Sequence, residues 1–173
     1  MKKSTKLAVI IGTTAVSLTV AATGAQASEA GHSVSWIYNE DTGTLVSNGK
    51  CLDADLDSID NNGTKVQLWD CNGSTEQQWQ IDDINADGTV VRNAMSQRCL
   101  DADINSIDSN GTKVQLWDCD GSTEQQWRFG RGELPYNITN LASHDAGYER
   151  YLTTPPSDDQ PENGTPVGLW GWN

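Results

Sequence analysis

The chain has 173 residues, of which 24 are Asp or Glu and 11 are Lys or Arg, so its formal net charge at pH 7 is −13. A surface this acidic repels phosphate backbones and anionic lipids, which argues against nucleic acid and membrane partners and leaves neutral or cationic ligands. The charges are spread along the chain instead of forming a block, which is typical of a solubilising surface.

The first 27 residues have the layout of a secretory signal peptide. Three lysines occur by residue 6, residues 7–22 are an apolar run diluted by Thr and Ser, and residues 25–27 offer an A-x-A cleavage site. Cleavage there leaves residues 28–173, which are 146 residues with a net charge of −16 and the size of a single domain. Because no other apolar run could cross a bilayer, we expect a secreted, extracellular protein.

The middle of the chain contains one 30-residue unit twice. Residues 51–80 and 99–128 match at 25 positions and are offset by 48 residues. A fixed period of this size indicates a repeat architecture. A third, degenerate copy follows, in which Tyr151-Leu152 stands in place of Cys-Leu and residues 163–165 repeat the N-G-T turn. The expected repeats are approximately 36–81, 82–129 and 130–173.

The third copy reaches residue 173 without a Q-x-W segment, and a related segment lies near the other end of the chain. Trp36 precedes a G-T-L-V strand as Trp79 precedes G-T-V-V. We therefore expect the strand at residues 35–38 to complete the third unit, pairing beside residues 167–170 with Trp36 buried, because an open barrel would leave an unpaired strand edge.

Four cysteines, Cys51, Cys71, Cys99 and Cys119, occur in the exported part of the chain. Four cysteines permit three pairings. Identical units should form identical internal bonds, so the repeat predicts Cys51–Cys71 and Cys99–Cys119. Each disulfide closes a loop of about 20 residues and stabilises the fold by roughly 3 kcal/mol.

The segments within each unit are short and have the pattern of β-strands. Polar and apolar side chains alternate through residues 65–69, K-V-Q-L-W, with the period of a half-buried strand. Residues 43–46 and 88–91 are further predicted strands, and no segment shows convincing helical periodicity. Three units of about four strands predict an all-β fold, a β-trefoil with three pseudo-symmetric repeats, since solenoids stack more copies and propellers need more blades. The predicted core includes Leu52, Leu68, Trp79, Leu100, Leu116 and Trp127.

The repeated motif C-L-D-x(n)-G-T-x-V-Q-L-W-D-C-x-G-x(3)-Q-x-W resembles that of the ricin B-type lectins, which include the family 13 carbohydrate-binding modules. The resemblance covers residues 36–129 well and 130–173 weakly. It implies a carbohydrate-binding lectin that is not an enzyme and needs no cofactor. Its partners would be glycans or polysaccharides, bound by a monomer.

The resemblance also implies which residues bind sugar. An Asp after the first half-cystine accepts hydrogen bonds from hydroxyls, an aromatic ring stacks on the C–H face, and amides fix the orientation. A pyranose needs both features, because it has a polar edge and an apolar face. The first site would use Asp53, Gln67, Trp69 and Gln77, and the second Asp101, Gln115, Trp117 and Gln125.

Two features depart from that family. Glu76 and Glu124 stand where the well-known sugar-binding members carry Asn, and a carboxylate accepts but cannot donate as an amide does. In the third copy Thr153 replaces the Asp, so we expect no sugar site there.

Two other functions remain open from the sequence. The first is calcium binding, because the aspartates at positions 53, 55, 57 and 60 have the spacing of an EF-hand calcium loop. Ser58 stands where that loop has its turn Gly and Thr64 where it has its closing Glu, so calcium binding is an alternative and no metal site is the expectation. Trefoils also serve as protease inhibitors that act through loops, and fold alone does not choose between functions. An enzyme has little support, because the two histidines lie outside any catalytic motif.

Overall fold

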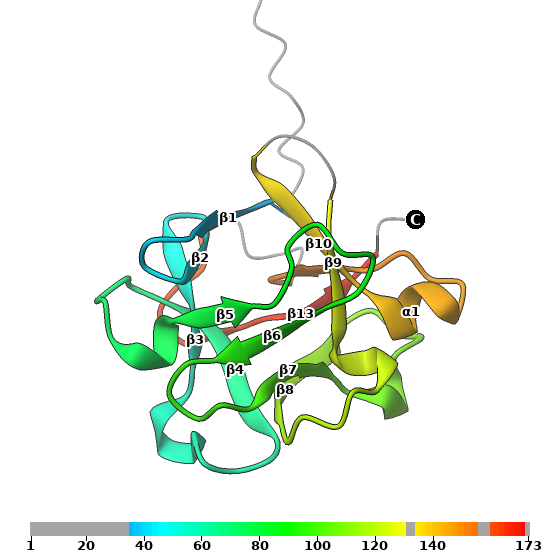
Figure 1. Ribbon diagram of the computed structural model, residues 1–173, viewed down its shortest axis with the longest axis horizontal. Helices are drawn as coiled ribbons and strands as arrows, with labels where there is room; N and C mark the ends of the chain where they lie inside the picture. The colour runs from blue at the N-terminus through cyan, green and yellow to red at the C-terminus, as the bar shows by residue number, and fades with distance from the viewer. Residues whose placement is uncertain (1–34, 131–133, 156–159, 172–173) are drawn as a thin grey trace, which may run out of the picture. The chain divides into compact units, whose positions relative to one another are not determined.

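Short strands connected by loops form three similar units in the described chain (Figure 1). The computed structural model describes residues 35–130, 134–155 and 160–171; the predicted signal peptide, residues 1–27, lies outside them. The described residues all belong to one compact part of the chain, His32–Asn173, which contains the three units. Among them, no helix has the length and apolarity needed to span a membrane.

Each unit consists of a first strand, a two-stranded hairpin and a last strand. The first unit contains β2 (Thr44–Ser47), β3 (Lys50–Ala54), β4 (Thr64–Trp69) and β5 (Trp79–Ile81). The second contains β6 (Thr89–Asn93), β7 (Cys99–Ala102), β8 (Thr112–Trp117) and β9 (Gln126–Phe129). The third contains β10 (Tyr136–Asn140), β11 (Tyr151–Thr153), β12 (Thr165–Pro166) and β13 (Gly168–Trp170). Short 3₁₀ turns lie at Leu56–Ser58, Thr75–Gln77, Ile104–Ser106 and Thr123–Gln125.

The N-terminal strand β1 (Ser35–Asn39) is the last strand of the third unit, as predicted. It pairs with β10 of that unit and with β2 of the first unit. The other last strands do the same: β5 pairs with β6, and β9 pairs with both β10 and β6. The amide of Trp79 donates to Gly43 O at 2.7 Å, beside β2, so the first and last strands form a closed ring. Closure leaves these strands no free edge, which confirms the β-trefoil.

The prediction that the N-terminal strand β1 pairs beside residues 167–170 is wrong, however. Residues 168–170 form β13, which pairs with β11 of its own hairpin and with β8, and not with β1. The physical reason is that each last strand already has a first strand on either side in the ring. The hairpins pair with one another instead, as β4 does with β8 and β12 with β4.

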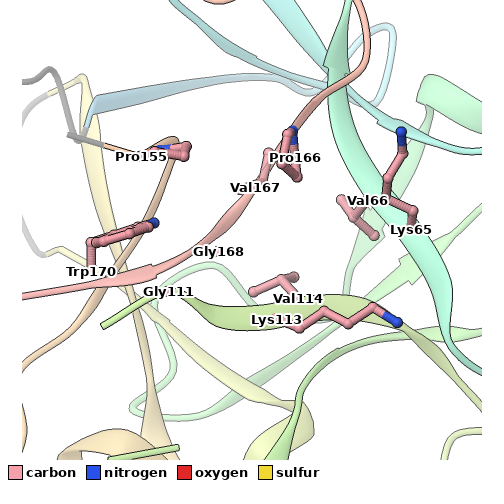
Figure 2. A pocket seen from close by; sticks show the side chains of 10 residues that line it. All are labelled: Lys65, Val66, Gly111, Lys113, Val114, Pro155, Pro166, Val167, Gly168 and Trp170. Carbon is pink, nitrogen blue, oxygen red and sulfur yellow. The ribbon is translucent and has the colours of Figure 1, made fainter. Parts of the chain in front are cut away.

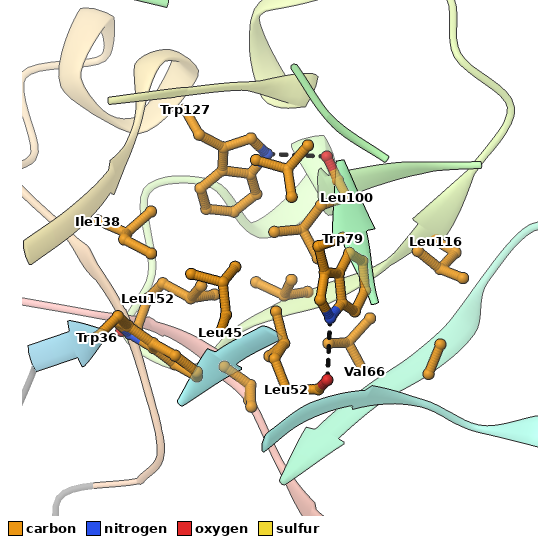
Figure 3. Packing of buried hydrophobic residues seen from close by; sticks show 14 of the residues in the cluster. Trp36, Leu45, Leu52, Val66, Trp79, Leu100, Leu116, Trp127, Ile138 and Leu152 are labelled. Carbon is orange, nitrogen blue, oxygen red and sulfur yellow. Dashed lines mark hydrogen bonds between the residues drawn. The ribbon is translucent and has the colours of Figure 1, made fainter. Parts of the chain in front are cut away.

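Three buried tryptophans fasten the ring to the hairpins (Figure 3). The indole Nε1 of Trp79 donates to Leu52 O at 2.9 Å, and that of Trp127 donates to Leu100 O at 2.9 Å. Trp36, which is 1% exposed, donates in the same way to Leu152 O at 2.7 Å. Trp36 therefore takes the place of the Q-x-W tryptophan in the third unit. The predicted core leucines and tryptophans are all buried in this cluster.

Both predicted disulfides are confirmed. Cys51 is bonded to Cys71 and Cys99 to Cys119, and the described chain has no free cysteine. Each bond joins the start of a hairpin to the residues that follow its second strand.

The described chain has one short α-helix, which the absence of helical periodicity in the sequence did not indicate. Residues Leu141–Asp145 form α1, a single helical turn whose first residues are capped by the Asn140 side chain, which accepts from Ser143 N at 3.3 Å. Five residues are too few to show a 3.6-residue period, so the pattern could not reveal the helix.

The closure predicts the effect of truncating Trp36. Trp36→Ala should lower the free energy of unfolding by roughly 3–5 kcal/mol, because it empties a core position and removes the bond to Leu152 O. Ile37→Ala, on the same strand but half exposed, should change it by less than about 0.5 kcal/mol. Urea unfolding of both variants measures the difference, and equal small effects would show that this strand does not support the core.

Candidate functional site

Two pockets at equivalent positions of the first two units contain most of the predicted site residues. Their volumes are about 190 and 180 Å³. The first is lined by Asp53, Asp55, Leu56, Gln67, Trp69, Asn72 and Glu76. The second is lined by Asp101, Asp103, Ile104, Asn105, Gln115, Trp117, Asp120 and Glu124. Each pocket therefore lies between a hairpin, the 3₁₀ turn inside it and the loop that leads to the Q-x-W strand.

The hairpin register fixes the centre of the first pocket. Cys51 lies opposite Trp69 and Asp53 opposite Gln67 on the paired strands β3 and β4. Gln67 Nε2 donates to Asp53 Oδ1 at 2.9 Å. Gln77 Nε2 donates to the other oxygen, Oδ2, at 3.0 Å. Both carboxylate oxygens are thus held by amides, with the lone pairs that remain free to accept from a ligand.

The second pocket repeats this arrangement. Asp101 lies opposite Gln115, whose Nε2 donates to Oδ1 at 3.0 Å, and Gln125 Nε2 donates to Oδ2 at 3.2 Å. Because the pattern occurs twice at similar distances, it is a property of the unit and its sequence.

Gln77 and Gln125 support the pockets without lining them. Gln77 is fully buried, and its Nε2 also donates to Asp70 O at 3.0 Å while its Oε1 accepts from Asn72 N at 3.0 Å. Gln125 makes the same bonds to Asp118 O and Asp120 N. These two glutamines therefore position the aspartates.

A partly exposed tryptophan forms one wall of each pocket. Trp69 and Trp117 are each 39% exposed, whereas the Q-x-W tryptophans Trp79 and Trp127 are buried in the core. The exposed side chain of Leu56, or of Ile104 in the second pocket, adds a second apolar surface. Each pocket thus combines a flat apolar ring with a fixed carboxylate.

The electrostatics of both pockets are negative. Burial raises the pKa of Asp53 above its ordinary value of 3.8; the hydrogen bonds from Gln67 and Gln77 oppose this shift, and the nearby charge of Glu76 adds to it. Burial likewise raises the pKa of Asp101, against the two glutamine bonds and with the charge of Glu124. No Lys or Arg is among the residues that line either pocket.

Two buried asparagines were missed by the sequence analysis. Asn93 Nδ2 donates to Glu76 O at 2.8 Å, and Asn140 Nδ2 donates to Glu124 O at 2.8 Å. Each belongs to the first strand of the following unit, so the loop that carries the pocket glutamate is held from the next unit. The available signal was that each asparagine ends the first strand of its unit, in T-V-V-R-N and Y-N-I-T-N.

The third unit lacks the same constellation. Thr153 and Gly168 are paired where the other units pair Asp with Gln. Trp170 instead lines a hollow of about 270 Å³ together with Val66, Val114 and Val167, which occupy equivalent positions in the three units (Figure 2). The residues that line this hollow include no carboxylate, so it does not have the pattern of the other two pockets.

The aspartates with EF-hand spacing do not converge. Asp55 Oδ1 accepts from Asp57 N at 3.4 Å and so caps the 3₁₀ turn. Within the described ranges, no group of three or more His, Cys, Asp or Glu residues is placed to hold a metal ion.

This geometry agrees with the sequence comparison. The family of ricin-type beta-trefoil lectin domains matches residues 20–146, which is most of the chain. The chain belongs to the ricin-type β-trefoil lectin family. No curated protein matches its sequence.

Solved structures show the same fold. The designed three-fold symmetric protein ThreeFoil has a TM-score of 0.62 at 21% identity, with 80% of this chain and 89% of ThreeFoil covered. The Rhizoctonia solani agglutinin has a TM-score of 0.55 at 18% identity, covering 80% and 86%. The exo-beta-1,3-galactanase 1,3Gal43A from Clostridium thermocellum has a TM-score of 0.62 at 24% identity, but this chain covers only 27% of its length. At these identities the likeness concerns the fold.

The support that Gln77 gives Asp53 predicts two effects of Gln77→Met. Loss of the amide leaves buried polar groups unpaired and should lower the free energy of unfolding by about 1–3 kcal/mol at pH 7. It should also raise the pKa of Asp53 further. Since a carboxyl whose folded pKa exceeds its unfolded pKa is protonated first in the folded state, part of the lost stability should return as pH falls through that folded pKa.

Carbon-13 NMR titration of the Asp53 carboxyl and urea unfolding at pH 7 and pH 4 measure these effects. Gln78→Met is the matched control, because the side chain of Gln78 makes one exposed bond among the described residues, to Gly73 O at 3.3 Å, and none to Asp53. An Asp53 pKa unchanged by Gln77→Met would contradict the assigned role.

Proposed function

We propose that this protein is a secreted lectin that binds glycans, without catalysis, at two shallow sites in its first two units. The observation that carries the proposal is the duplicated pairing of an amide-held carboxylate with a half-exposed tryptophan. The lining residues proposed to touch sugar are Asp53, Gln67 and Trp69 in the first site, and Asp101, Gln115 and Trp117 in the second. Gln77 and Gln125 act through the aspartates they hold.

The chemistry of a pyranose matches this pair of features. The ring of Trp69 can stack on the apolar C–H face of the sugar, while Asp53 accepts hydrogen bonds from hydroxyls on its edge. Because Gln67 and Gln77 fix both oxygens of Asp53, the carboxylate does not need to be ordered when ligand binds.

The same contacts support binding without catalysis. Asp53 and Asp101 each accept amide hydrogens at both oxygens, which suits an acceptor and disfavours a general acid that must carry a proton. His144 lies on α1, outside the residues that line either pocket.

The proposal predicts two ligands per chain and a separate loss at each tryptophan. A glycan array selects a monovalent sugar, and calorimetry with it should give two weak sites. Trp69→Ala should remove one of them, costing on the order of 1–3 kcal/mol of stacking there, with little loss of folding stability. Trp79→Ala should instead destabilise the fold by roughly 3–5 kcal/mol. One site or three in the unmodified protein would refute the assignment.

The negative pockets predict a preference by sugar charge. Galactose, galactosamine and galacturonic acid share one ring geometry. At pH 6 galactose is neutral, galactosamine carries a positive charge and galacturonic acid carries a negative charge. Galacturonate should bind at least about fivefold more weakly than galactose, and galactosamine at least as tightly, because carboxylates line both pockets. Line broadening and shifts of the tryptophan indole protons by NMR report the binding. If the array selects another parent sugar, the same series is made in that ring. Tighter binding of the acid would contradict the electrostatic argument.

A further inference from the structure

The N-G-T turn of each unit lies against a different unit. In the third unit, Asn163 Oδ1 accepts from Asp70 N at 2.8 Å, and its Nδ2 donates to Asp70 Oδ2 at 2.9 Å. Lys50 Nζ joins the pair, donating to Asp70 Oδ1 at 2.7 Å and to Asn163 Oδ1 at 2.9 Å. Asp70 directly follows Trp69, the wall of the first pocket. We call this contact of a turn asparagine with the residue after a neighbouring unit's tryptophan the clasp.

The first unit forms the same clasp on the second. Asn62 Oδ1 accepts from Asp118 N at 2.8 Å, and Asn62 Nδ2 donates to Asp118 Oδ2 at 2.9 Å. Arg98 occupies the place of Lys50 and bonds to both Asn62 and Asp118. Asp118 directly follows Trp117, so this clasp adjoins the second pocket.

The second unit forms the third clasp, next to a unit without a pocket of this kind. Asn110 Oδ1 accepts from Gly171 N at 2.8 Å, beside Trp170, and Arg150 bonds to Asn110. In all three clasps the asparagine accepts from a backbone N–H and from a cationic side chain, but the third has Gly171 in place of the aspartate, and only the first two adjoin a candidate sugar site.

A short chain of contacts connects the first clasp to the pocket. Asp70 O accepts from Gln77 Nε2, the same nitrogen that donates to Asp53. The turn also backs the pocket wall: a Cβ at Gly164 would lie 3.7 Å from Cζ3 of Trp69 and 3.8 Å from Oε1 of Gln67. Gly164 has a φ of +90°, which a residue with a side chain would adopt only under strain.

We propose that Asn163 is a positioning residue of the first sugar site and Asn62 of the second, so that each site is completed across a unit boundary. This inference rests on the proposed sugar binding. It gives the third unit a function that its own residues do not show: although it lacks the Asp and Gln of a site, it supplies the turn that holds Asp70, Trp69 and, through Gln77, Asp53.

Single-site proteins make the test specific. Asp101→Asn leaves the first site and Asp53→Asn leaves the second. Asn163→Ala, Asn62→Ala and Asn110→Ala are then introduced one at a time into each parent. The probes are D-galactose, D-xylose and D-mannose, followed through the tryptophan indole resonances, and urea unfolding is measured for every variant.

The expected pattern separates positioning from stability. In the first-site parent, Asn163→Ala should weaken binding by roughly threefold to tenfold, as loss of its hydrogen bonds implies, while Asn62→Ala and Asn110→Ala leave it unchanged. In the second-site parent, only Asn62→Ala should weaken binding. All three variants should lower the unfolding midpoint, because each removes the hydrogen bonds of one clasp. Asn163→Ser, which keeps a hydrogen-bonding oxygen, should lose less than Asn163→Ala and serves as the test if the Ala variant does not fold.

Two results would overturn the inference in different ways. If the parents bind a probe and Asn163→Ala behaves as Asn110→Ala does, the clasp is only structural and the proposed function stands. If neither parent nor the unmodified protein binds any of the three probes or any glycan on an array, the proposed function fails and this inference fails with it.

Discussion

The Q-x-W segment fastens the ring of strands to each hairpin through its glutamine and its tryptophan, and both the core and the pockets depend on it. The tryptophan indole bonds to the carbonyl of Leu52, while the glutamine two residues earlier holds the carboxylate of Asp53. The bond from the tryptophan organises the core, and the bond from the glutamine organises the pocket. In the third unit Trp36 keeps the tryptophan bond, while Thr153 stands in place of the aspartate whose carboxylate the glutamine would hold. Fold and site can therefore be lost separately.

Much of this arrangement could be predicted from the sequence because the repeat is internal evidence. Two copies that match at 25 of 30 positions define the cysteine pairs, the hairpins and the core leucines, and the register that brings Asp53 opposite Gln67 follows from the shared disulfide frame. Contacts between units could not be read in this way. The pairing of β1 with β2, the support from Asn93 and the clasps all join segments of different units, and a repeat says nothing about which copies are neighbours.

The choice of neutral amides to hold the pocket carboxylates has a consequence for recognition. An Arg or Lys paired with Asp53 would satisfy the carboxylate and neutralise it, and a ligand would then compete with an ion pair. Gln67 and Gln77 instead compensate burial while leaving the negative charge in place, and Glu76 adds a second carboxylate to the same lining. Burial of this charged carboxylate raises the pKa of Asp53, and the amide bonds oppose that shift. The pocket is thereby suited to ligands rich in hydrogen-bond donors.

Near-identity of the first two units does not make their pockets equal. Within the linings, Asn72 of the first pocket corresponds to Asp120 of the second, which changes the local charge. Outside them, the first pocket is held by Lys50 and a turn of the degenerate third unit, and the second by Arg98 and a turn of the first unit. Arg presents a planar fork and Lys a single mobile ammonium, so the two clasps differ in rigidity. Each of the two pockets is therefore bounded by its own unit and held by a turn of a neighbouring one, and under the proposed role of the clasps the degenerate unit would contribute to recognition through the neighbour that it supports.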